Sequence, residues 1–570
     1  MRLSTCFATV LAAVASTAVV SAAVAPYNLD ITYVDNVNAD GVSSRRVIGV
    51  NNKWPPPLVV ADYNETITVN VKNSLDVPTS MHSHGLFFKG ENYLDGPSGI
   101  TQCGIPPGGT YKYEYVPKQW GTYWYHAHNG GQYVDGFRGP LIIRNPNEPY
   151  KYDFEYIVIL HDWYHNQFDD ILKDYAGVYN PTGSEPPPDN VIILIHDGTD
   201  YIEKMKFLPG KTYRLRIINM SAFTMYHFSI GGHSMDVIEV DGDDTERKTT
   251  NGFWVSVAQR WSVLVTAKNA TDKNYPVNLI VDDSMFAIIP PTLKLNYTTT
   301  IEYSPTATLD ETPAPYEELD DIELSPIIKE ASTPANQTIT LDVLLDLLDD
   351  GINHGSFNGI TWTRPQVPTI FTALSAGPDA TNPDIYGKRT NAIIIEHMSM
   401  VQVIINNNDG GSHPFHLHGH KFQIMGRSTE FYDPSKPYPE LDNPIRRDVV
   451  QVPAMGSAVI RFRADNPGVW LFHCHIQWHM ETGLAATFIE APLEMQKTVK
   501  PPAFVFDQCK SQNIATSGNA LGKLGTDMEG EELGPQPLSG TWEKKGKIAL
   551  AFTILSALLG LGTVVWFAST

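Results

Sequence analysis

Histidine residues in this sequence are grouped at spacings that suit metal binding. Residues i and i+2 of an extended strand point to the same face, so each His-x-His motif places two imidazole rings side by side. One such pair is commonly a pair of surface histidines, but four groups favour a metal centre. A structural zinc site is closed by four ligands, whereas the eight histidines of these pairs could surround three metal ions. The grouped histidines are His82, His84, His126, His128, His413, His416, His418, His473, His475 and His479.

One cysteine lies among these histidines. Cys474 is flanked by His473 and His475, and His413 and His479 remain once the paired histidines are assigned to a cluster. Two imidazoles and a thiolate with a weak or absent axial ligand are typical of a blue copper electron-transfer site. Because the neighbours of Cys474 would bind the cluster, a few covalent bonds would connect the two sites.

The sequence contains an internal repeat that carries these motifs. Gly121–His128 aligns with Gly468–His475, and His82–Gly85 aligns with His416–Gly419. We therefore expect the first and last domains to be versions of one β-sandwich, with a third version that lacks paired histidines between them.

The cysteine-containing set occurs in the last repeat only. The matching positions of the first repeat hold no possible thiolate or imidazole ligand, so that repeat is expected to have no mononuclear site. These positions are Thr79, Ala127 and Gln132.

Short segments rich in Val, Ile, Thr and Tyr recur along the chain between Gly, Pro and Asn residues, which predicts an all-β protein. Leu341 to Asp350 is a candidate short helix. We expect a signal peptide at 1–22, β-sandwich domains at 23–145, 146–300 and 301–500, a stalk at 501–547 and a transmembrane anchor at 548–568.

Features of both chain ends indicate the secretory pathway. An apolar run followed by small residues begins the chain, as in a signal peptide. Ile548 to Ala568 carries no charge and is long enough to cross a bilayer. Lysines on its outer side oppose the positive-inside tendency, so a cleaved lipid-anchor signal near Ser539 and Gly540 is an alternative. Glycosylation acceptor motifs begin at Asn64, Asn219, Asn269, Asn296 and Asn336.

The formal net charge of -22 disfavours nucleic acid as a partner, because that role requires a basic surface. Cations are the more natural partners of such a chain.

The motifs described above resemble those of multicopper oxidases, the family of laccases, ascorbate oxidase and ferroxidases, over nearly all of residues 26–500. The resemblance implies three consecutive cupredoxin-like β-sandwich domains and four copper ions as cofactor. It also implies the ligands: type 1 copper is bound by His413, Cys474 and His479, type 2 copper by His82 and His416, and the type 3 pair by His84, His126, His128, His418, His473 and His475.

The same resemblance assigns roles to several other residues. Asp95 resembles the family acid that helps deliver protons to oxygen, although an ordinary Asp-Gly turn is its simpler interpretation. Gln477 stands where many relatives carry an acid, so the proton path is expected to differ. Leu484 replaces a frequent axial methionine, which is expected to raise the type 1 potential. Cys103 and Cys509 resemble a disulfide of laccase-like members.

Within the family, the chain is most similar to fungal cell-surface ferroxidases that act with an iron permease. The C-terminal anchor, the segment Asn180–Pro186 and the acid four residues before His413 carry this similarity. It makes Glu185 and Asp409 the iron-binding and electron-entry carboxylates, and hard oxygen ligands of this kind stabilise ferric iron.

Without the similarity, Glu185 would be a solvated loop residue and Asp409 a turn residue. Two further positions depart from these ferroxidases. Ala287 and His354 stand where a third acid and a tyrosine are expected, and Asp282 or Asp283 is a possible substitute for the acid.

The implied function is oxidation of Fe(II) to Fe(III) with four-electron reduction of dioxygen to water, in support of high-affinity iron uptake. The implied location is the plasma membrane, with the catalytic domains outside and an iron permease as partner. A laccase-like oxidase of phenols or aromatic amines is an alternative function, and a copper-storing surface protein is a third. The vacuolar membrane is an alternative location.

Overall fold

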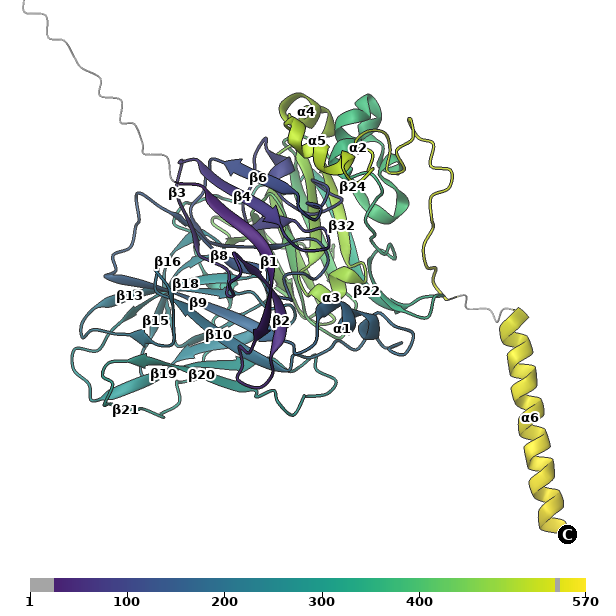
Figure 1. Ribbon diagram of the computed structural model, residues 1–570, viewed down its shortest axis with the longest axis horizontal. Coiled ribbons are helices and arrows are strands. Elements are labelled where there is room, and N and C mark those ends of the chain that lie inside the picture. The colour runs from purple at the N-terminus through teal and green to yellow at the C-terminus, as the bar shows by residue number, and fades with distance from the viewer. Residues whose placement is uncertain (1–24, 539–543) are drawn as a thin grey trace, which may run out of the picture.

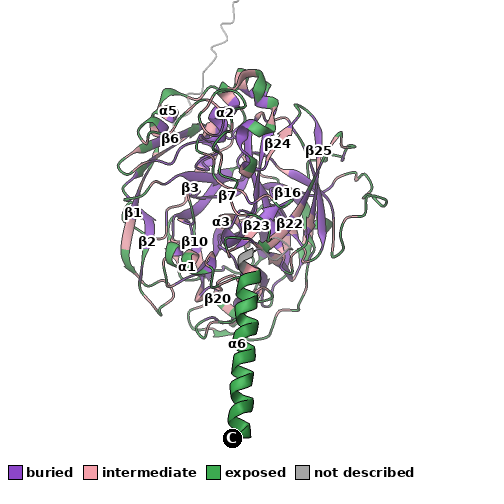
Figure 2. Ribbon diagram, turned by 90° about the vertical axis from the view of Figure 1, so that its right-hand side faces the viewer, coloured by how far each residue is buried: buried purple, intermediate pink, exposed green. Residues whose placement is uncertain are grey.

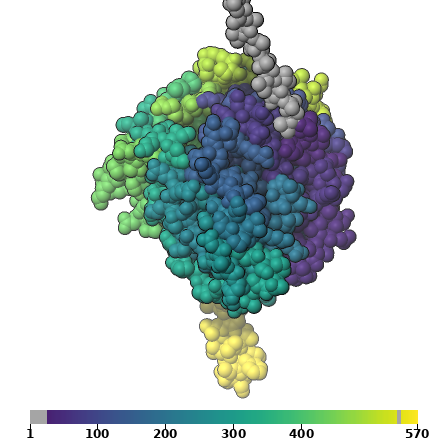
Figure 3. Space-filling view, turned by 90° about the vertical axis from the view of Figure 1, so that its left-hand side faces the viewer, coloured from purple at the N-terminus to yellow at the C-terminus, as the bar shows by residue number. Residues whose placement is uncertain are grey.

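The computed structural model describes residues 25–538 and 544–570. The predicted signal peptide and the alternative lipid-anchor site at Ser539 and Gly540 therefore lie outside the described residues. Three consecutive β-sandwiches form the body, followed by one long helix, which confirms the expected all-β class (Figure 1). The sandwiches form one continuous surface, purple, teal and green in chain order (Figure 3). The domain boundaries near 145 and 300 stay a prediction.

The first sandwich consists of two four-stranded sheets, ordered β2-β1-β4-β6 and β3-β8-β7-β5. All seven residues of β7 are buried, as expected for a strand that is covered on both faces. Its elements are β1 (Tyr27–Val37), β2 (Arg45–Val50), β3 (Val59–Asp62), β4 (Ile67–Asn73), β5 (Met81–His84), η1 (Asn92–Leu94), β6 (Thr110–Tyr115), β7 (Gly121–Ala127) and β8 (Arg138–Arg144).

The second sandwich packs a seven-stranded sheet, β11-β10-β9-β13-β18-β15-β16, with a six-stranded sheet, β12-β20-β19-β14-β17. Its elements are β9 (Phe154–Trp163), α1 (Phe168–Tyr175), β10 (Asn190–His196), β11 (Tyr201–Ile202), β12 (Met205–Lys206), β13 (Thr212–Asn219), β14 (Tyr226–Ile230), β15 (Met235–Val240), β16 (Asp243–Thr250), β17 (Gly252–Val255), β18 (Arg260–Thr266), β19 (Lys273–Val281), β20 (Asn296–Glu302), β21 (Thr308–Leu309) and η2 (Asp321–Glu323).

The third sandwich packs a six-stranded sheet, β23-β22-β25-β30-β27-β28, with a five-stranded sheet, β24-β32-β31-β26-β29. Its elements are β22 (Gln337–Leu347), β23 (Asn353–Phe357), α2 (Thr369–Ser375), η3 (Gly377–Thr381), η4 (Pro383–Tyr386), η5 (Lys388–Thr390), β24 (Ala392–Ile395), β25 (Met400–Asn407), β26 (His413–Leu417), β27 (Phe422–Ser428), β28 (Arg446–Arg447), β29 (Val449–Val452), β30 (Ser457–Arg463), β31 (Gly468–Cys474), α3 (Gln477–Glu481) and β32 (Ala485–Glu490).

The expected helix from Leu341 to Asp350 is wrong, because most of this segment belongs to β22. Ile339, Leu341 and Val343 are buried while the residues between them are more exposed, which is the period of a strand. Pairing of β22 with β25 and β23 outweighs the helical preference of its leucines.

Most of the predicted stalk packs against the body instead of extending from it. After α4 (Pro492–Thr498), helix α5 (Ala503–Lys510) carries Cys509, which forms the expected disulfide with Cys103. Further along, Ala520 exchanges backbone hydrogen bonds with the third sandwich, and Pro537 pairs with Leu348. Composition alone did not reveal these contacts, because they combine a few apolar side chains of α5 with backbone hydrogen bonds further along the chain.

The last helix, α6 (Lys544–Ser569), contains the predicted anchor. Its segment Gly546–Ser569 is, among the described residues, the one helix long and apolar enough to cross a membrane, by length and composition. Its described side chains are exposed along its whole length (Figure 2). This matches a helix that requires an apolar environment outside the protein.

One of the five glycosylation motifs is excluded by the fold. The Asn219 side chain is fully buried and donates to the backbone oxygens of Thr224 and Val255. The other four acceptor asparagines are exposed, and their glycosylation stays a prediction.

A buried carboxylate joins the first sandwich to the second and should make stability depend on pH. Glu239 accepts hydrogen bonds from Thr122 and from Arg214, at 2.9 and 2.6 Å. Burial raises the pKa of Glu239, but Arg214 and Arg216 lower it from 4.5 to about 2. The folded pKa lies below the unfolded one, so this stabilisation is present above about pH 4.5 and is lost as pH falls toward 2.

In Glu239→Gln we therefore expect a loss of about 3 kcal/mol of stability near neutral pH that shrinks as pH falls from 5 to 3. Thermal midpoints across this range measure it. The exposed Asp153, which pairs with Lys211, supplies the control Asp153→Asn, which should show little change. A midpoint difference for Glu239→Gln that is constant with pH would contradict the ionic role.

Candidate metal centre

The paired histidines of the first and third sandwiches meet at the interface between these two sandwiches. In the first, β5 pairs with β7 so that His82 lies opposite His126, and in the third His416 of β26 lies opposite His473 of β31. Across the interface, the His84 and His416 rings stack at 3.7 Å between centroids. The eight buried histidines of this cluster are His82, His84, His126, His128, His416, His418, His473 and His475.

The hydrogen bonds of these rings leave one nitrogen of several histidines free for a metal. His82 Nδ1 bonds to the Asp95 backbone oxygen, and His126 Nδ1 to that of Ala127. In each ring the other nitrogen, Nε2, is buried without a hydrogen-bond partner. A buried polar atom without a partner is costly, so the cluster fits bound metal ions, whose ligands are neutral imidazoles.

Asp95 lies directly against this cluster. One carboxylate oxygen is 2.9 Å from His418 Nδ1, and the other lies 3.2 Å from His82 Nδ1. Burial raises the pKa of Asp95 above its ordinary value, so its site favours the protonated form. The structure thus places the predicted acid where it can hold a proton beside the cluster.

The cysteine-containing set is also assembled as expected. Cys474 Sγ lies 3.7 Å from His413 Nδ1 and 3.5 Å from His479 Nδ1, and those two nitrogens are 3.0 Å apart. Burial raises the pKa of the Cys474 thiol, but the two histidines lower it to about 7. A deprotonated thiol with two imidazoles fits one copper ion. Leu484, which offers no ligand atom, is fully buried next to this set.

Both predicted carboxylates contact the outer nitrogens of this set. Glu185 Oε1 lies 2.7 Å from His479 Nε2, and Asp409 Oδ2 lies 3.1 Å from His413 Nε2. Their side chains are 12% and 26% exposed. Burial raises the pKa of Asp409, but the contact with His413 lowers it to about 2, so this group is an anion at neutral pH. A cation bound by these carboxylates would be separated by one imidazole ring from a metal held by the cysteine-containing set.

The third expected acid is missing from this place. Ala287 is exposed, and Met285 occupies the neighbourhood of Asp409, since a Cβ on Gly411 would lie 2.5 Å from the Met285 methyl group. His354 Nε2 donates to the Asp350 carboxylate at 2.9 Å. Among the described residues, therefore, two carboxylates rather than three contact the histidines of the cysteine-containing set.

Gln477 has an acidic partner that the sequence did not single out. Its amide donates to Glu481 at 2.6 Å, one turn later in α3, and burial raises the pKa of Glu481. Glu481 and His128 both line a cleft of about 250 Å³. A carboxyl group thus lies one helical turn after position 477, and the i,i+4 spacing was the available signal.

In the first sandwich, the position equivalent to the cysteine-containing set is filled by neutral side chains. Thr79 donates to Gln132 at 2.7 Å. A hydrogen bond between two neutral side chains occupies this place.

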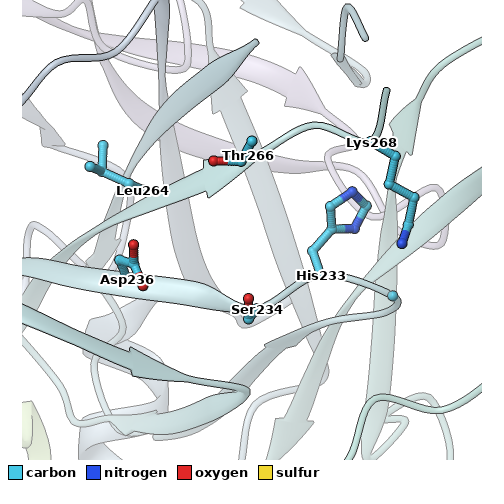
Figure 4. A pocket seen from close by; sticks show the side chains of 7 residues that line it. His233, Ser234, Asp236, Leu264, Thr266 and Lys268 are labelled. Carbon is cyan, nitrogen blue, oxygen red and sulfur yellow. The ribbon is translucent and has the colours of Figure 1, made fainter. Parts of the chain in front are cut away.

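A further pocket lies on β15 and β18 of the second sandwich, away from both ligand sets (Figure 4). Both ring nitrogens of its His233 have partners, the Gly231 backbone oxygen and the Tyr303 hydroxyl. We assign no metal to this pocket.

Comparisons with known proteins agree with this geometry. Residues 31–148, 154–306 and 362–494 match sequence models described as multicopper oxidase. The iron multicopper oxidase fer1 of Mycosarcoma maydis is 42% identical over 96% of this chain and 93% of that protein. The iron transport multicopper oxidase fio1 of Schizosaccharomyces pombe is 43% identical over 95% and 89%.

Solved structures give the same result. Fet3p, described as a multicopper oxidase that functions in iron import, superposes with a TM-score of 0.84 at 39% identity, over 88% of this chain and 97% of that chain. A laccase from Botrytis aclada gives 0.75 at 27% identity, over 86% and 92%.

Proposed function

Because this chain belongs to the multicopper oxidase family, we propose that it is a ferroxidase that uses four copper ions. Four Fe(II) ions each lose one electron, and one dioxygen takes up four electrons and four protons to give two water molecules. The observation that carries the proposal is the contact of Glu185 and Asp409 with the outer nitrogens of His479 and His413.

The two carboxylates have the chemistry that an iron substrate requires. Oxygen anions bind Fe(II) and stabilise Fe(III) more strongly, which makes the electron easier to remove. Each carboxylate also fixes the orientation of one imidazole that would hold copper. When bound, the copper ions would accept single electrons at one site and reduce dioxygen at the other.

The remaining residues would hold the cofactor and supply protons. His413, Cys474 and His479 would hold one ion, and the eight clustered histidines would hold three. The backbone of Cys474 connects the two ligand sets directly, since His473 and His475 are its neighbours. Asp95, whose pKa is raised by burial, lies next to His418 and would supply a proton.

A direct comparison of substrates tests the proposal. For the purified full-length protein in detergent, we expect oxygen consumption to be faster with Fe(II) than with a phenolic substrate at equal concentration. The electron-entry carboxylates attract a cation through their charge, whereas they offer a neutral phenol only a hydrogen bond. Faster turnover of the phenol would favour the laccase-like alternative, which is supported by the missing third acid and by Met285 beside Asp409. Absence of oxygen uptake would favour copper storage.

We further propose that α6 holds the protein in the plasma membrane with the three sandwiches outside the cell, where an iron permease in the same membrane receives the Fe(III). The length and apolar composition of Gly546–Ser569 support the anchor. The names of the relatives, which concern iron transport, support the partnership. The vacuolar membrane is the alternative location.

A further inference from the structure

A fully buried ion pair joins the second sandwich to the third beside the histidine cluster. Arg260 begins β18, and Asp448 lies between β28 and β29. Arg260 Nη1 donates to Asp448 Oδ1 at 2.7 Å, and Nη2 donates to Oδ2. Both side chains are 0% exposed. A bidentate pair of this kind fixes the carboxylate in one plane and one position.

Asp448 in turn contacts one histidine of the first sandwich and one of the third. Its Oδ1 lies 3.1 Å from His84 Nε2, and its backbone oxygen lies 2.9 Å from His416 Nδ1. The opposite nitrogens, His84 Nδ1 and His416 Nε2, have no hydrogen-bond partner. An acceptor on one ring nitrogen requires that this nitrogen carry the proton, which leaves the other one free to bind a metal.

The remaining donors of Arg260 hold its guanidinium in place. Nε donates to the backbone oxygen of Thr122 in the first sandwich at 3.1 Å, and Nη1 also donates to that of Ala258 at 3.1 Å. The guanidinium carbon lies 5.6 Å from the centre of the Tyr123 ring. Arg260 therefore contacts all three sandwiches through its own atoms or through Asp448. The single ammonium of a lysine cannot reproduce this fork.

Gly85, directly after His84, is required because Arg260 and Asp448 lie close to its backbone. Gly85 has a φ of +90°, and a Cβ there would lie 2.7 Å from both Arg260 Nη2 and Asp448 Oδ2. Any larger residue would displace the ion pair from the histidines. The His-Ser-His-Gly segment thus combines two ligands with the space that their supporting pair needs.

We propose that Arg260 is a positioning residue for the copper cluster, acting through Asp448 on His84 and His416. The second sandwich supplies none of the eight histidines, yet it fixes the orientation of two of them. The cluster can then reach its full copper content only when all three sandwiches are docked. The inference rests on the proposed copper function, because it concerns ligands of that cofactor.

The test compares Arg260→Lys with a matched control in the full-length protein. Arg446→Lys is the control, since Arg446 is also buried and joins the third sandwich to the second through Asp243 at 2.8 Å, but contacts none of the clustered histidines. The readouts are copper per chain by elemental analysis, the type 2 copper signal in electron paramagnetic resonance, the blue absorbance and the thermal midpoint.

In Arg260→Lys we expect cluster copper to bind about 10- to 100-fold more weakly and the type 2 signal to change, while the blue absorbance is retained. Arg446→Lys should keep the wild-type copper content and type 2 signal even if its thermal midpoint falls. If Arg260→Lys does not fold, Gly85→Ala tests the same contact from the other side and should show the same selective loss.

A wild-type copper content and type 2 signal in Arg260→Lys would overturn the proposal, as would an equal copper loss in both lysine variants. If neither Arg260→Lys nor Gly85→Ala folds while Arg446→Lys does, the pair is structural and the proposal fails. Wild-type protein that binds no copper would overturn the ferroxidase proposal together with this inference.

Discussion

The Cys474→Ser variant is expected to lose its blue colour and its oxygen-consuming turnover, which should fall to background. A serine hydroxyl is a poor copper ligand at neutral pH, whereas the Cys474 thiol already has a pKa of about 7 beside His413 and His479. The eight clustered histidines do not depend on the sulfur, so most of their copper should remain. Visible absorbance, copper analysis and oxygen uptake with Fe(II) measure the three effects.

Ala127→Ser is the matched control for this variant. Ala127 lies between His126 and His128 at the equivalent position of the first sandwich and is also buried. The Ala127→Ser change places the same hydroxyl beside the cluster and should leave the blue colour intact. A blue Cys474→Ser protein would show that the thiolate is not the source of the colour.

The second expected result separates iron from organic substrates. Glu185→Ala combined with Asp409→Ala should reduce Fe(II) turnover by at least about tenfold, since each carboxylate removed costs on the order of 1 to 3 kcal/mol. Oxidation of a bulky aromatic amine should be largely retained, because such a donor needs only access to a ligand imidazole. Steady-state kinetics with both substrates measure the difference.

The control for the double variant removes two acids elsewhere. Glu311 and Glu318 are exposed and contact neither His413 nor His479, so Glu311→Ala with Glu318→Ala tests the effect of net charge alone. This control variant should leave the turnover of both iron and amine unchanged. Equal losses on iron and amine in the Glu185 and Asp409 variant would point to a structural role, and no loss on either would favour the laccase-like function.

The ligand histidines could be predicted from the sequence because their spacing is local. His82 and His84 lie together on β5, and in each other pair the second histidine comes one residue after the strand that carries the first, so extended geometry placed the two rings together. Because the motif is repeated in two sandwiches, its pairs could be assigned to one common metal cluster. The same reasoning failed at β22, whose leucine-rich run suggested a helix although its partners in the sheet determine its conformation.

The supporting residues could not be predicted in the same way. Arg260 and Asp448 are 188 residues apart, and their pairing depends on how the second sandwich docks on the third. Glu481 was closer to prediction, being four residues after Gln477. The raised pKa of Glu481 depends on burial, which the sequence around α3 does not reveal. Long-range contacts between folded sandwiches are thus what sequence patterns leave out.

The disulfide between Cys103 and Cys509 joins residues 406 positions apart and closes the chain between them into a covalent ring. A protease that cuts once within this ring, for example in the largely exposed segment 310–318, therefore releases no fragment. His82 and His84 precede the ring, and α6 follows it, so such a cut leaves both histidines covalently linked to the anchor. If α6 holds the protein in a membrane, as proposed, a single cleavage sheds the complete oxidase only when it occurs between Cys509 and α6.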